Sequence, residues 1–364
     1  TAEVRALPRG TLAKLVLPAG RQYGLVHANP HSLITARLLT RNLETAIDAG
    51  FFERRLERAL HLREKLLPGG HYRLVHGEGD GVPGLVVDRY GDAVVVQPNS
   101  AGMAAVVDAV IAAVQRTLAP KAIVVRGDSQ ARKLEGLAVE APRVVGDIES
   151  PVPVHEGGRV FYADLLAGQK TGWFFDQRAN REWLARQATG GRMLDLYSYS
   201  GGFAGHALAA GAAYAEAVDR SSEALALAQR AVDEAGHGAR FATTTGDVFN
   251  VLGDLVEAKR RFEVVVCDPP PFAPSKKDVP AALRGYRKLA RGAAAVTAAE
   301  GFLAVASCSH NVTSDALLQA TFEGVRDAGR QGRLIFSGGA GPDHPLHPAL
   351  AESRYLSFLV FALD

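Results

Sequence analysis

The chain has 364 residues, of which 47% are hydrophobic and 22% charged, and its formal net charge is +2. This composition is typical of a folded globular protein and excludes an extended disordered chain. The length exceeds that of one typical domain, so two or three domains are expected. The longest run without a charged side chain, residues 196–215, contains one His, four Gly and two Ser, so neither a transmembrane helix nor a signal peptide is predicted.

Positive charge is concentrated at the start of the chain. Residues 1–70 hold 11 Lys or Arg against 6 Asp or Glu, whereas the rest of the chain sums to −3. This segregation favours a contact with a polyanion, the alternative being an amphipathic helix with solvated charges. The two Cys, Cys267 and Cys308, lack zinc-ligand spacing, which favours a reducing cytoplasm. His344 and His347 stand beside prolines without a third ligand, so a rigid loop is predicted there rather than a metal site.

The first seventy residues predict a small β module and a helix. Residues 32–40 are strand-like and follow a stretch punctuated by Gly and Pro, so residues 1–45 are expected to form the module. The chain opens with Thr1 and not Met, which predicts that this module is incomplete at its start. From Asp48 to Leu67, apolar residues recur at helical spacing with Arg interleaved, so residues 46–70 are expected to hold a linker helix.

Residues 71–165 alternate strand and turn, which predicts an α+β middle domain. Strands are expected at 85–88 and 93–97, a helix at 103–118 and another strand at 122–126. A closing hairpin is expected at 152–162, around two adjacent glycines.

From about residue 166 to 364, strands alternate with Gly turns and helices, the pattern of βαβ units. A helix is expected at 222–235, where Ser221 or Ser222 can cap it and Glu223 favours its first turn. The predicted fold class is therefore α/β, with a Rossmann-like, mostly parallel seven-stranded sheet. Strands are expected at 193–196, 213–218, 262–267, 302–307 and 355–363.

Two of these strands stop at groups able to do chemistry. Asp268 follows the apolar run 264–267, and Cys308 follows the run 302–307. Because the carboxyl ends of parallel strands share one edge of a sheet, the acid and the thiol are expected on the same rim. Cys267 precedes Asp268 on its strand, so alternation predicts that it faces the core.

The first strand of this region is followed by Gly201 and Gly202, where side chains would block a ligand from the backbone. This signal is weak by itself, since it lacks the spacing of dinucleotide folds. Asp219 ends the second strand, where a carboxylate can accept both hydroxyls of an adenosine ribose. Asp247 stands where a third strand would present an acceptor to an adenine amine. Together these spacings favour a nucleoside-bearing cofactor.

This combination resembles a class I S-adenosylmethionine-dependent methyltransferase. More narrowly, it is similar to the family of ribosomal large-subunit RNA methyltransferases that join an N-terminal PUA domain to a middle domain and a Rossmann-like catalytic domain. The resemblance spans nearly the whole chain. It rests on the residues at 29–34, 79–92, 168–181 and 199–203, on Asp268-Pro269-Pro270 with Phe272, on Arg284-Gly285-Tyr286, and on Ser307-Cys308-Ser309.

The resemblance implies formation of 5-methylcytosine in large-subunit (23S) ribosomal RNA, with S-adenosylmethionine as cofactor. Carbon 5 of cytosine is a poor nucleophile, so a thiolate, assigned to Cys308, must first add to carbon 6. Asp268 would hydrogen-bond the cytosine edge or shuttle a proton at its ring nitrogen. Naked ribosomal RNA or an assembling ribosomal particle is the implied partner, and a homodimer is one option.

The implied binding residues form two sets. The cofactor set is Asp195, Tyr197, Ser200, Gly201, Gly202, Phe203, Asp219, Asp247, Val248, Asp268 and Arg178. The RNA set is Phe272, which would stack on the base, with Lys276, Lys277, Arg284, Arg287 and Lys288. The family often carries Lys in place of Pro271, so Lys276 or Lys277 is expected to supply that cation.

Each assignment has a competitor. Cys308 could be a buried structural thiol, and the basic cluster could be a solvated helix face. Lys170, Asp176 and Arg178 could form a structural ion-pair network instead of touching cofactor or RNA. At the level of function, the competitors are an amino methyltransferase that uses the Asp-Pro-Pro-Phe-like motif without a thiol, and a non-catalytic RNA-binding assembly factor.

Overall fold

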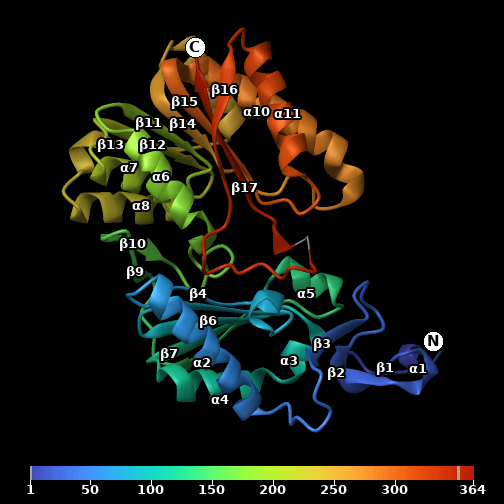
Figure 1. The fold of residues 1–364 in the computed structure, drawn as a ribbon. Helices are drawn as coiled ribbons and strands as arrows, with labels where there is room; N and C mark the ends of the chain where they lie inside the picture. Colours follow the sequence, from blue (N-terminus) through green and yellow to red (C-terminus); the bar gives the residue numbers. More distant parts are fainter. Residues whose placement is uncertain (1, 351–352) are drawn as a thin grey trace. The chain divides into compact units, whose positions relative to one another are not determined.

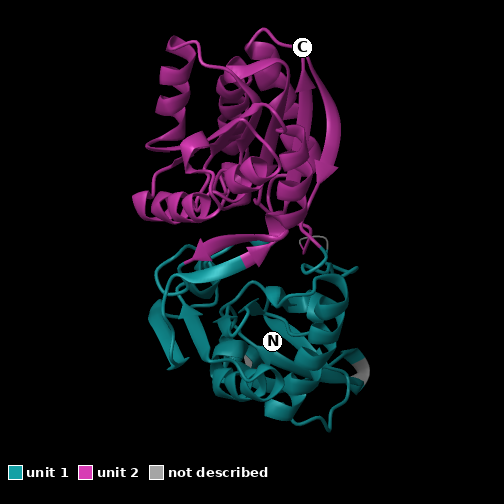
Figure 2. Cartoon of the chain, turned by 90° about the vertical axis from the view of Figure 1, so that its left-hand side faces the viewer, with its two compact units in different colours: residues 1–154, 164–175, 342–350 teal, residues 155–163, 176–341, 351–364 magenta. Residues whose placement is uncertain are grey.

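The computed structural model describes residues 2–350 and 353–364. The chain divides into two compact units (Figure 2). Unit 1 comprises Thr1–Val154, Asp164–Phe175 and Pro342–Leu350, and unit 2 comprises His155–Ala163, Asp176–Gly341 and Ala351–Asp364. No helix in the described residues is long and apolar enough to cross a bilayer.

Unit 1 begins with α1 (Ala2–Arg5) and an antiparallel sheet of β1 (Thr11–Val16), β2 (Gln22–Ala28) and β3 (Ala36–Thr40). The strand predicted from residue 32 starts only at Ala36. The preceding residues form a turn, in which the Ser32 N–H donates to the Asn29 carbonyl at 3.2 Å. The side chains of Asn29 and Ser32 both donate to buried Glu135, which fixes this turn.

A second sheet of unit 1 has the order β4-β5-β6-β7-β8 within the described residues. Helix α2 (Ala49–Leu66) is capped by Asp48, which accepts from the Phe51 N–H at 3.0 Å, and it buries Phe51, Phe52 and Leu56. The predicted helix 103–118 is divided at Val106, whose ψ of 17° interrupts the helical geometry. The strands are β4 (His71–His76), β5 (Leu85–Tyr90), β6 (Ala93–Pro98), β7 (Ala122–Gly127) and β8 (Glu140–Gly146), and the other helices are α3 (Ala101–Ala105), α4 (Val107–Leu118) and α5 (Gln130–Leu134).

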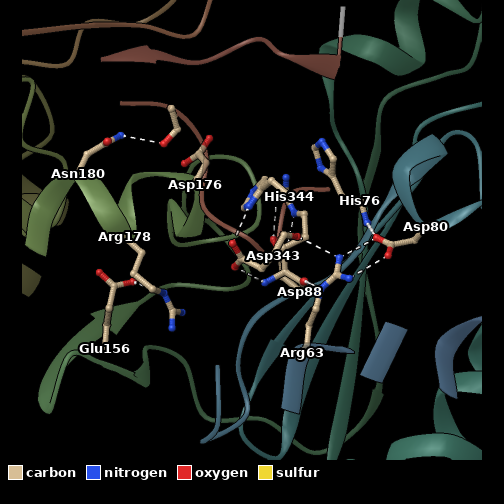
Figure 3. A network of polar contacts seen from close by, with 12 residues as sticks. Arg63, His76, Asp80, Asp88, Glu156, Asp176, Arg178, Asn180, Asp343 and His344 are labelled. Atoms are coloured by element: carbon tan, nitrogen blue, oxygen red, sulfur yellow. Dashed lines mark hydrogen bonds and ion pairs between the residues drawn. The ribbon is translucent and has the colours of Figure 1, made fainter. Parts of the chain in front are cut away.

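A buried polar cluster holds a late segment of the chain in unit 1. Arg63 is fully buried, and its guanidinium donates to both carboxylate oxygens of Asp80, at 2.9 and 2.7 Å, and to the Asp343 carbonyl at 3.0 Å (Figure 3). The Asp343 carboxylate accepts from the Arg73 N–H at 3.1 Å, and the Arg73 guanidinium pairs with buried Asp88. Because a buried charge needs a partner, this cluster fixes residues 342–350 in unit 1.

The larger sheet of unit 2 has the order β13-β12-β11-β14-β15-β17-β16 in the part of the chain that is described. Neighbours are parallel from β13 to β15, and β17 runs antiparallel to both β15 and β16. The predicted α/β class with a Rossmann-like sheet is confirmed. The strands are β11 (Arg192–Leu196), β12 (Tyr214–Asp219), β13 (Phe241–Thr245), β14 (Phe262–Cys267), β15 (Thr297–Ser307), β16 (Gly332–Gly338) and β17 (Ser357–Leu363).

Helices cover both faces of this sheet (Figure 1). One core joins the sheet to α9 (Val248–Glu257), α10 (Val279–Val296) and α11 (Ser314–Asp327). The other core joins it to α6 (Arg178–Gln187), α7 (Gly202–Ala209) and α8 (Ser222–Glu234). Along β14, Val265 and Cys267 belong to the first core, while Val264 and Val266 belong to the second, as strand alternation requires.

The predicted elements of unit 2 agree with the structure in kind, and their ends differ in places. The predicted strand 262–267 coincides with β14, and Ser221 caps α8 by accepting from the Ala224 N–H at 3.1 Å. Strand β15 begins five residues earlier than predicted, because Thr297 already pairs with Phe262 of β14. The register then shifts across an irregular stretch in which Glu300 has a φ of 57°, and pairing resumes at Phe302. The predicted hairpin is present as β9 (Val152–Glu156) and β10 (Arg159–Ala163).

Candidate active site

The site is built at the carboxyl edge of β11, β14 and β15. Asp268 follows β14 directly, and its backbone N–H donates to the Leu196 carbonyl of β11 at 3.2 Å. In the register of β14 and β15, Cys267 lies opposite Val305, so Cys308 emerges three residues further along the neighbouring strand. The acid and the thiol therefore leave adjacent strands at one edge of the sheet, as the sequence predicts.

Hydrogen bonds tie the loops after β14 and β15 together. The Ser309 hydroxyl and the Asn311 amide both donate to the Ala273 carbonyl, at 2.9 and 3.1 Å. The Tyr286 hydroxyl of α10 donates to Ser307 Oγ at 2.9 Å. Ser307 and Ser309 are buried, whereas Cys308 between them is partly exposed. The thiol is thus held between two anchored serines and keeps access to solvent.

Tyr286 lies close enough to Cys308 and Asp268 to be affected by their charges. Burial is the main cause that raises the pKa of this phenol, and the nearby Cys308 and Asp268 act in the same direction. Burial also raises the pKa of the Cys267 thiol, and Cys267 has no exposed surface. The prediction that Cys267 is a core residue is confirmed.

Phe272 packs against Tyr286. Its ring centroid is 4.8 Å from that of Tyr286, with a 40° tilt, and its side chain is partly buried. A Cβ added at Gly285 would come within 3.2 Å of Phe272 Cδ2, so the glycine lets the ring lie against α10.

A buried amide pair contacts Asp268. Gln177 Nε2 donates to Asp268 Oδ2 at 2.9 Å, and Asn180 Nδ2 donates to Gln177 Oε1 at 2.7 Å. Gln177 and Asn180 are 2% and 1% exposed. The sequence reasoning did not assign either residue a role, although both stand in the 168–181 motif on which the resemblance rests.

The loop after β11 adopts an uncommon backbone conformation. Tyr197, Tyr199 and Gly201 have φ values of 62°, 50° and 71°. A Cβ at Gly201 would lie 2.6 Å from the Ala228 Cβ, so glycine is required here for both the positive φ and the packing. Asp219 holds the loop, because its carboxylate accepts from the Tyr199 N–H at 2.8 Å and the Ser221 N–H at 2.9 Å.

Polar atoms without a hydrogen-bond partner among the described residues collect near the end of β11 and in the loop that follows it. Asp195 is fully buried, and its Oδ2 accepts from the Ala204 N–H at 3.0 Å. Asp195 Oδ1 and the buried hydroxyls of Ser198 and Ser200 have no hydrogen-bond partner among the described residues. Burial, and to a lesser extent the charges of nearby carboxylates, raises the pKa of Asp195 to about 7. A ligand that donates hydrogen bonds would satisfy this group.

Asp247 caps α9 by accepting from the Phe249 and Asn250 N–H groups, at 3.0 and 3.3 Å. It also pairs with Arg220, a hydrogen bond that is the main cause of its lowered pKa. Of the remaining residues of the predicted cofactor set, Val248 is buried at the start of α9, Gly202 begins α7, and Phe203 stacks on Phe358 with centroids 5.7 Å apart.

Arg178 forms an ion pair of 3.5 Å with Glu156 (Figure 3). Glu156 is buried and also accepts from Arg181 at 2.7 and 2.9 Å. Burial opposes ionisation of Glu156, but Arg181 and His206 keep its pKa below the usual range. This arrangement matches the structural ion-pair alternative for Arg178, and its role toward the cofactor stays a prediction.

The residues of the predicted RNA set have different surroundings. Arg287 pairs with Glu323 and Asp327 of α11, at 2.9 and 2.6 Å, so its charge is largely neutralised. The Lys288 ammonium lies 4.7 Å from the centre of the Phe249 ring. The side chains of Lys276, Lys277 and Arg284 are exposed.

A sheet of this topology, with Asp195 in its first strand in the sequence, β11, and Asp219 at the end of the next strand, β12, is typical of the class I S-adenosylmethionine-dependent methyltransferases. The model of the S-adenosylmethionine-dependent methyltransferase family matches residues 109–332. Ribosomal RNA large subunit methyltransferase I from Pseudoalteromonas atlantica is 34% identical over 336 residues, which cover 91% of this chain and 85% of that protein. The chain belongs to the ribosomal RNA large subunit methyltransferase I family.

Other comparisons agree. The protein of the same name from Klebsiella pneumoniae subsp. pneumoniae is 36% identical over 333 residues, covering 90% of this chain and 83% of its own. A solved structure described as a SAM-dependent methyltransferase from Streptococcus mutans has a TM-score of 0.83. Another, SMU.776 complexed with SAH, has a TM-score of 0.84. Both solved chains are 20% identical to this chain. Each match covers 98% of this chain and 92% of the solved chain, which establishes the shared fold.

The cofactor of the family is S-adenosylmethionine, and the residues at the ends of β11 and β12 fit it. Its methionine part carries an ammonium group, and Asp195 Oδ1 is a buried carboxylate oxygen without a partner among the described residues. Asp219 at the end of β12 suits ribose hydroxyls, since each of its oxygens keeps acceptor capacity beyond its one backbone N–H. When bound, the cofactor supplies an electrophilic methyl group.

Proposed function

We propose that the protein transfers a methyl group from S-adenosylmethionine to carbon 5 of a cytosine in large-subunit ribosomal RNA. The relatives named above support the RNA class, because their names specify the ribosomal large subunit. The observation that carries the carbon-5 chemistry is a partly exposed Cys308 beside the loop of Asp268. An enzyme that methylates an amino group has no need of a thiol at this place.

The chemistry assigns one role to each group. The Cys308 thiolate adds to carbon 6 of the cytosine, and the electron pair of the 5,6 double bond becomes available at carbon 5. Carbon 5 attacks the methyl group of S-adenosylmethionine and displaces S-adenosylhomocysteine. The proton on carbon 5 then leaves to solvent, the bond from sulfur to carbon 6 breaks, and the thiolate is regenerated. Asp268 exchanges a proton with the ring nitrogen as charge develops there.

The surroundings suit a base turned out of its stack. Both faces of the ring must be open, one to sulfur and one to the methyl group, so the base leaves its helix or loop at a cost of about a few kcal/mol. Phe272 is the proposed stacking partner, and the exposed Lys276, Lys277 and Arg284 are the proposed phosphate contacts. A thiol of ordinary pKa is only a few per cent ionised at neutral pH, so the proposed mechanism calls for a positive charge near Cys308, and these cations are the proposed source.

The test is methyl transfer to ribosomal RNA by the wild-type protein and by Cys308→Ala, with Cys267→Ala as a matched control for loss of a thiol. Cys308→Ala is expected to reduce transfer at least a thousandfold while binding S-adenosylmethionine normally by calorimetry. Digestion of the RNA to nucleosides and mass spectrometry identify the product. Full activity in Cys308→Ala, with 4-methylcytidine or another N-methylated base as product, would favour the amino methyltransferase. A folded wild-type protein that fails to bind S-adenosylmethionine would favour the assembly factor.

A further inference from the structure

Gln177 is buried in the site and contacts Asp268, but the proposed reaction gives it no role. It lies at the start of α6, 2% exposed, with one end of its amide on Asp268 and the other on Asn180. The Asn180 amide in turn donates to the Gly339 carbonyl at 3.2 Å. These contacts form a chain that runs from a backbone carbonyl to the carboxylate.

The Gly339 carbonyl, at one end of this series of contacts, fixes the direction of every hydrogen bond in it. The Gly339 carbonyl can only accept, so Asn180 must present its NH₂ group there, and the same group reaches Gln177. The Gln177 carbonyl oxygen therefore faces Asn180, and its NH₂ group faces Asp268. A Cβ at Gly338 would lie 2.2 Å from Asn180 Oδ1, so the glycine gives the Asn180 side chain its room.

We propose that Gln177 is a positioning residue that holds the Asp268 carboxyl group in one orientation for proton exchange with the substrate. Gln177 donates to Asp268 Oδ2 and is itself held by Asn180, so the Asp268 side chain cannot rotate without losing this hydrogen bond. This inference rests on the proposed function. In the reaction, the Asp268 carboxyl gives a proton to the ring nitrogen as sulfur bonds to carbon 6, and it takes that proton back when the bond to sulfur breaks.

The hydrogen bond from Gln177 also favours the ionised form of Asp268. A hydrogen bond donated to a carboxylate favours the charged state and keeps the pKa of that carboxyl lower than it would be without the donor. Removal of the Gln177 amide should therefore raise the pH at which Asp268 titrates. A residue that served only to fill space would leave that titration unchanged.

The experiment compares Gln177→Met with Gln187→Met. Both replace a glutamine by an apolar side chain of similar length, and Gln187 at the other end of α6 donates instead to the Trp183 carbonyl. In full-length protein labelled with ¹³C at the aspartate carboxyl carbon, the Asp268 signal is the one missing in Asp268→Asn. Gln177→Met is expected to raise its titration midpoint by about one pH unit, and Gln187→Met to leave it in place.

Activity gives the second readout. Gln177→Met is expected to lower kcat about tenfold, because Asp268 loses its orientation, and to move the basic limb of the pH profile upward, because the proton donor stays protonated to a higher pH; KM for S-adenosylmethionine should be unchanged. Asn180→Leu, which removes only the group that orients Gln177, should give a smaller shift in the same direction and serves if Gln177→Met does not fold. An unchanged Asp268 midpoint in the folded Gln177 or Asn180 variant, or an equal shift in Gln187→Met, would overturn the proposal. The titration needs no turnover, so its result is independent of which base is methylated.

Discussion

Replacement of Asp195 by asparagine should stabilise the protein at high pH and weaken its binding of S-adenosylmethionine. The Asp195 carboxyl is fully buried and its pKa is raised to about 7 from an ordinary value of 3.8. A raised pKa means that the native state favours the protonated acid, so its contribution to stability is complete below about pH 4 and is lost as the pH rises through 7. Between pH 5.5 and 8.5 this loss amounts to about 2 kcal/mol. The asparagine side chain would carry no charge and would still accept from the Ala204 N–H.

The assay is urea unfolding at pH 5.5 and 8.5. The chain has two tryptophans, Trp173 in unit 1 and Trp183 in unit 2, so a Trp173→Phe background lets fluorescence follow unit 2 alone. Asp195→Asn should gain about 2 kcal/mol on the parent between the two pH values, while Asp254→Asn on the exposed face of α9 should gain nothing. Calorimetry at pH 8.5 should give at least a tenfold weaker affinity for S-adenosylmethionine in Asp195→Asn. A stability difference that does not change with pH, or undiminished affinity, would refute this account of Asp195.

Two further substitutions test the loop and the basic surface. Gly201→Ala should destabilise unit 2 by about 2 kcal/mol or more, because it forces a Cβ to within 2.6 Å of the Ala228 Cβ at a φ of 71°; a chemical denaturation midpoint equal to that of wild type would contradict this. Arg284→Ala should weaken binding to ribosomal RNA and lower its salt dependence more than Arg287→Ala, because acidic side chains of α11 already neutralise Arg287. Equal losses in a filter-binding salt series would mean that the α11 ion pairs break when RNA binds.

The parts of the site that lie at strand ends could be predicted from the sequence. The apolar run 264–267 predicts a buried strand, and the end of that strand determines where Asp268 emerges. The same reasoning places Cys308 after β15 and puts Cys267 in the core. These features depend on local pattern and on the general rule that parallel strands share one edge.

The contacts of Asp268 could not be predicted in this way. Gln177 meets Asp268 across 91 positions of the chain, and Asn180 meets Gly339 across 159. Neither pairing leaves a periodic or compositional signal in a single sequence. Likewise, the break at Val106 has no Gly or Pro to announce it, and the turn before β3 depends on Glu135, about a hundred residues away.

The most direct test of the proposed mechanism is covalent trapping on ribosomal RNA that contains 5-fluorocytidine. Fluorine at carbon 5 cannot leave as a proton does, so the bond from sulfur to carbon 6 cannot be broken after methyl transfer. Incubation with S-adenosylmethionine should give a protein–RNA adduct that survives denaturation, and peptide mass spectrometry should place it on Cys308. No adduct should form with Cys308→Ala. Methylation of unmodified RNA by a protein that forms no adduct with the fluorinated RNA would contradict the mechanism.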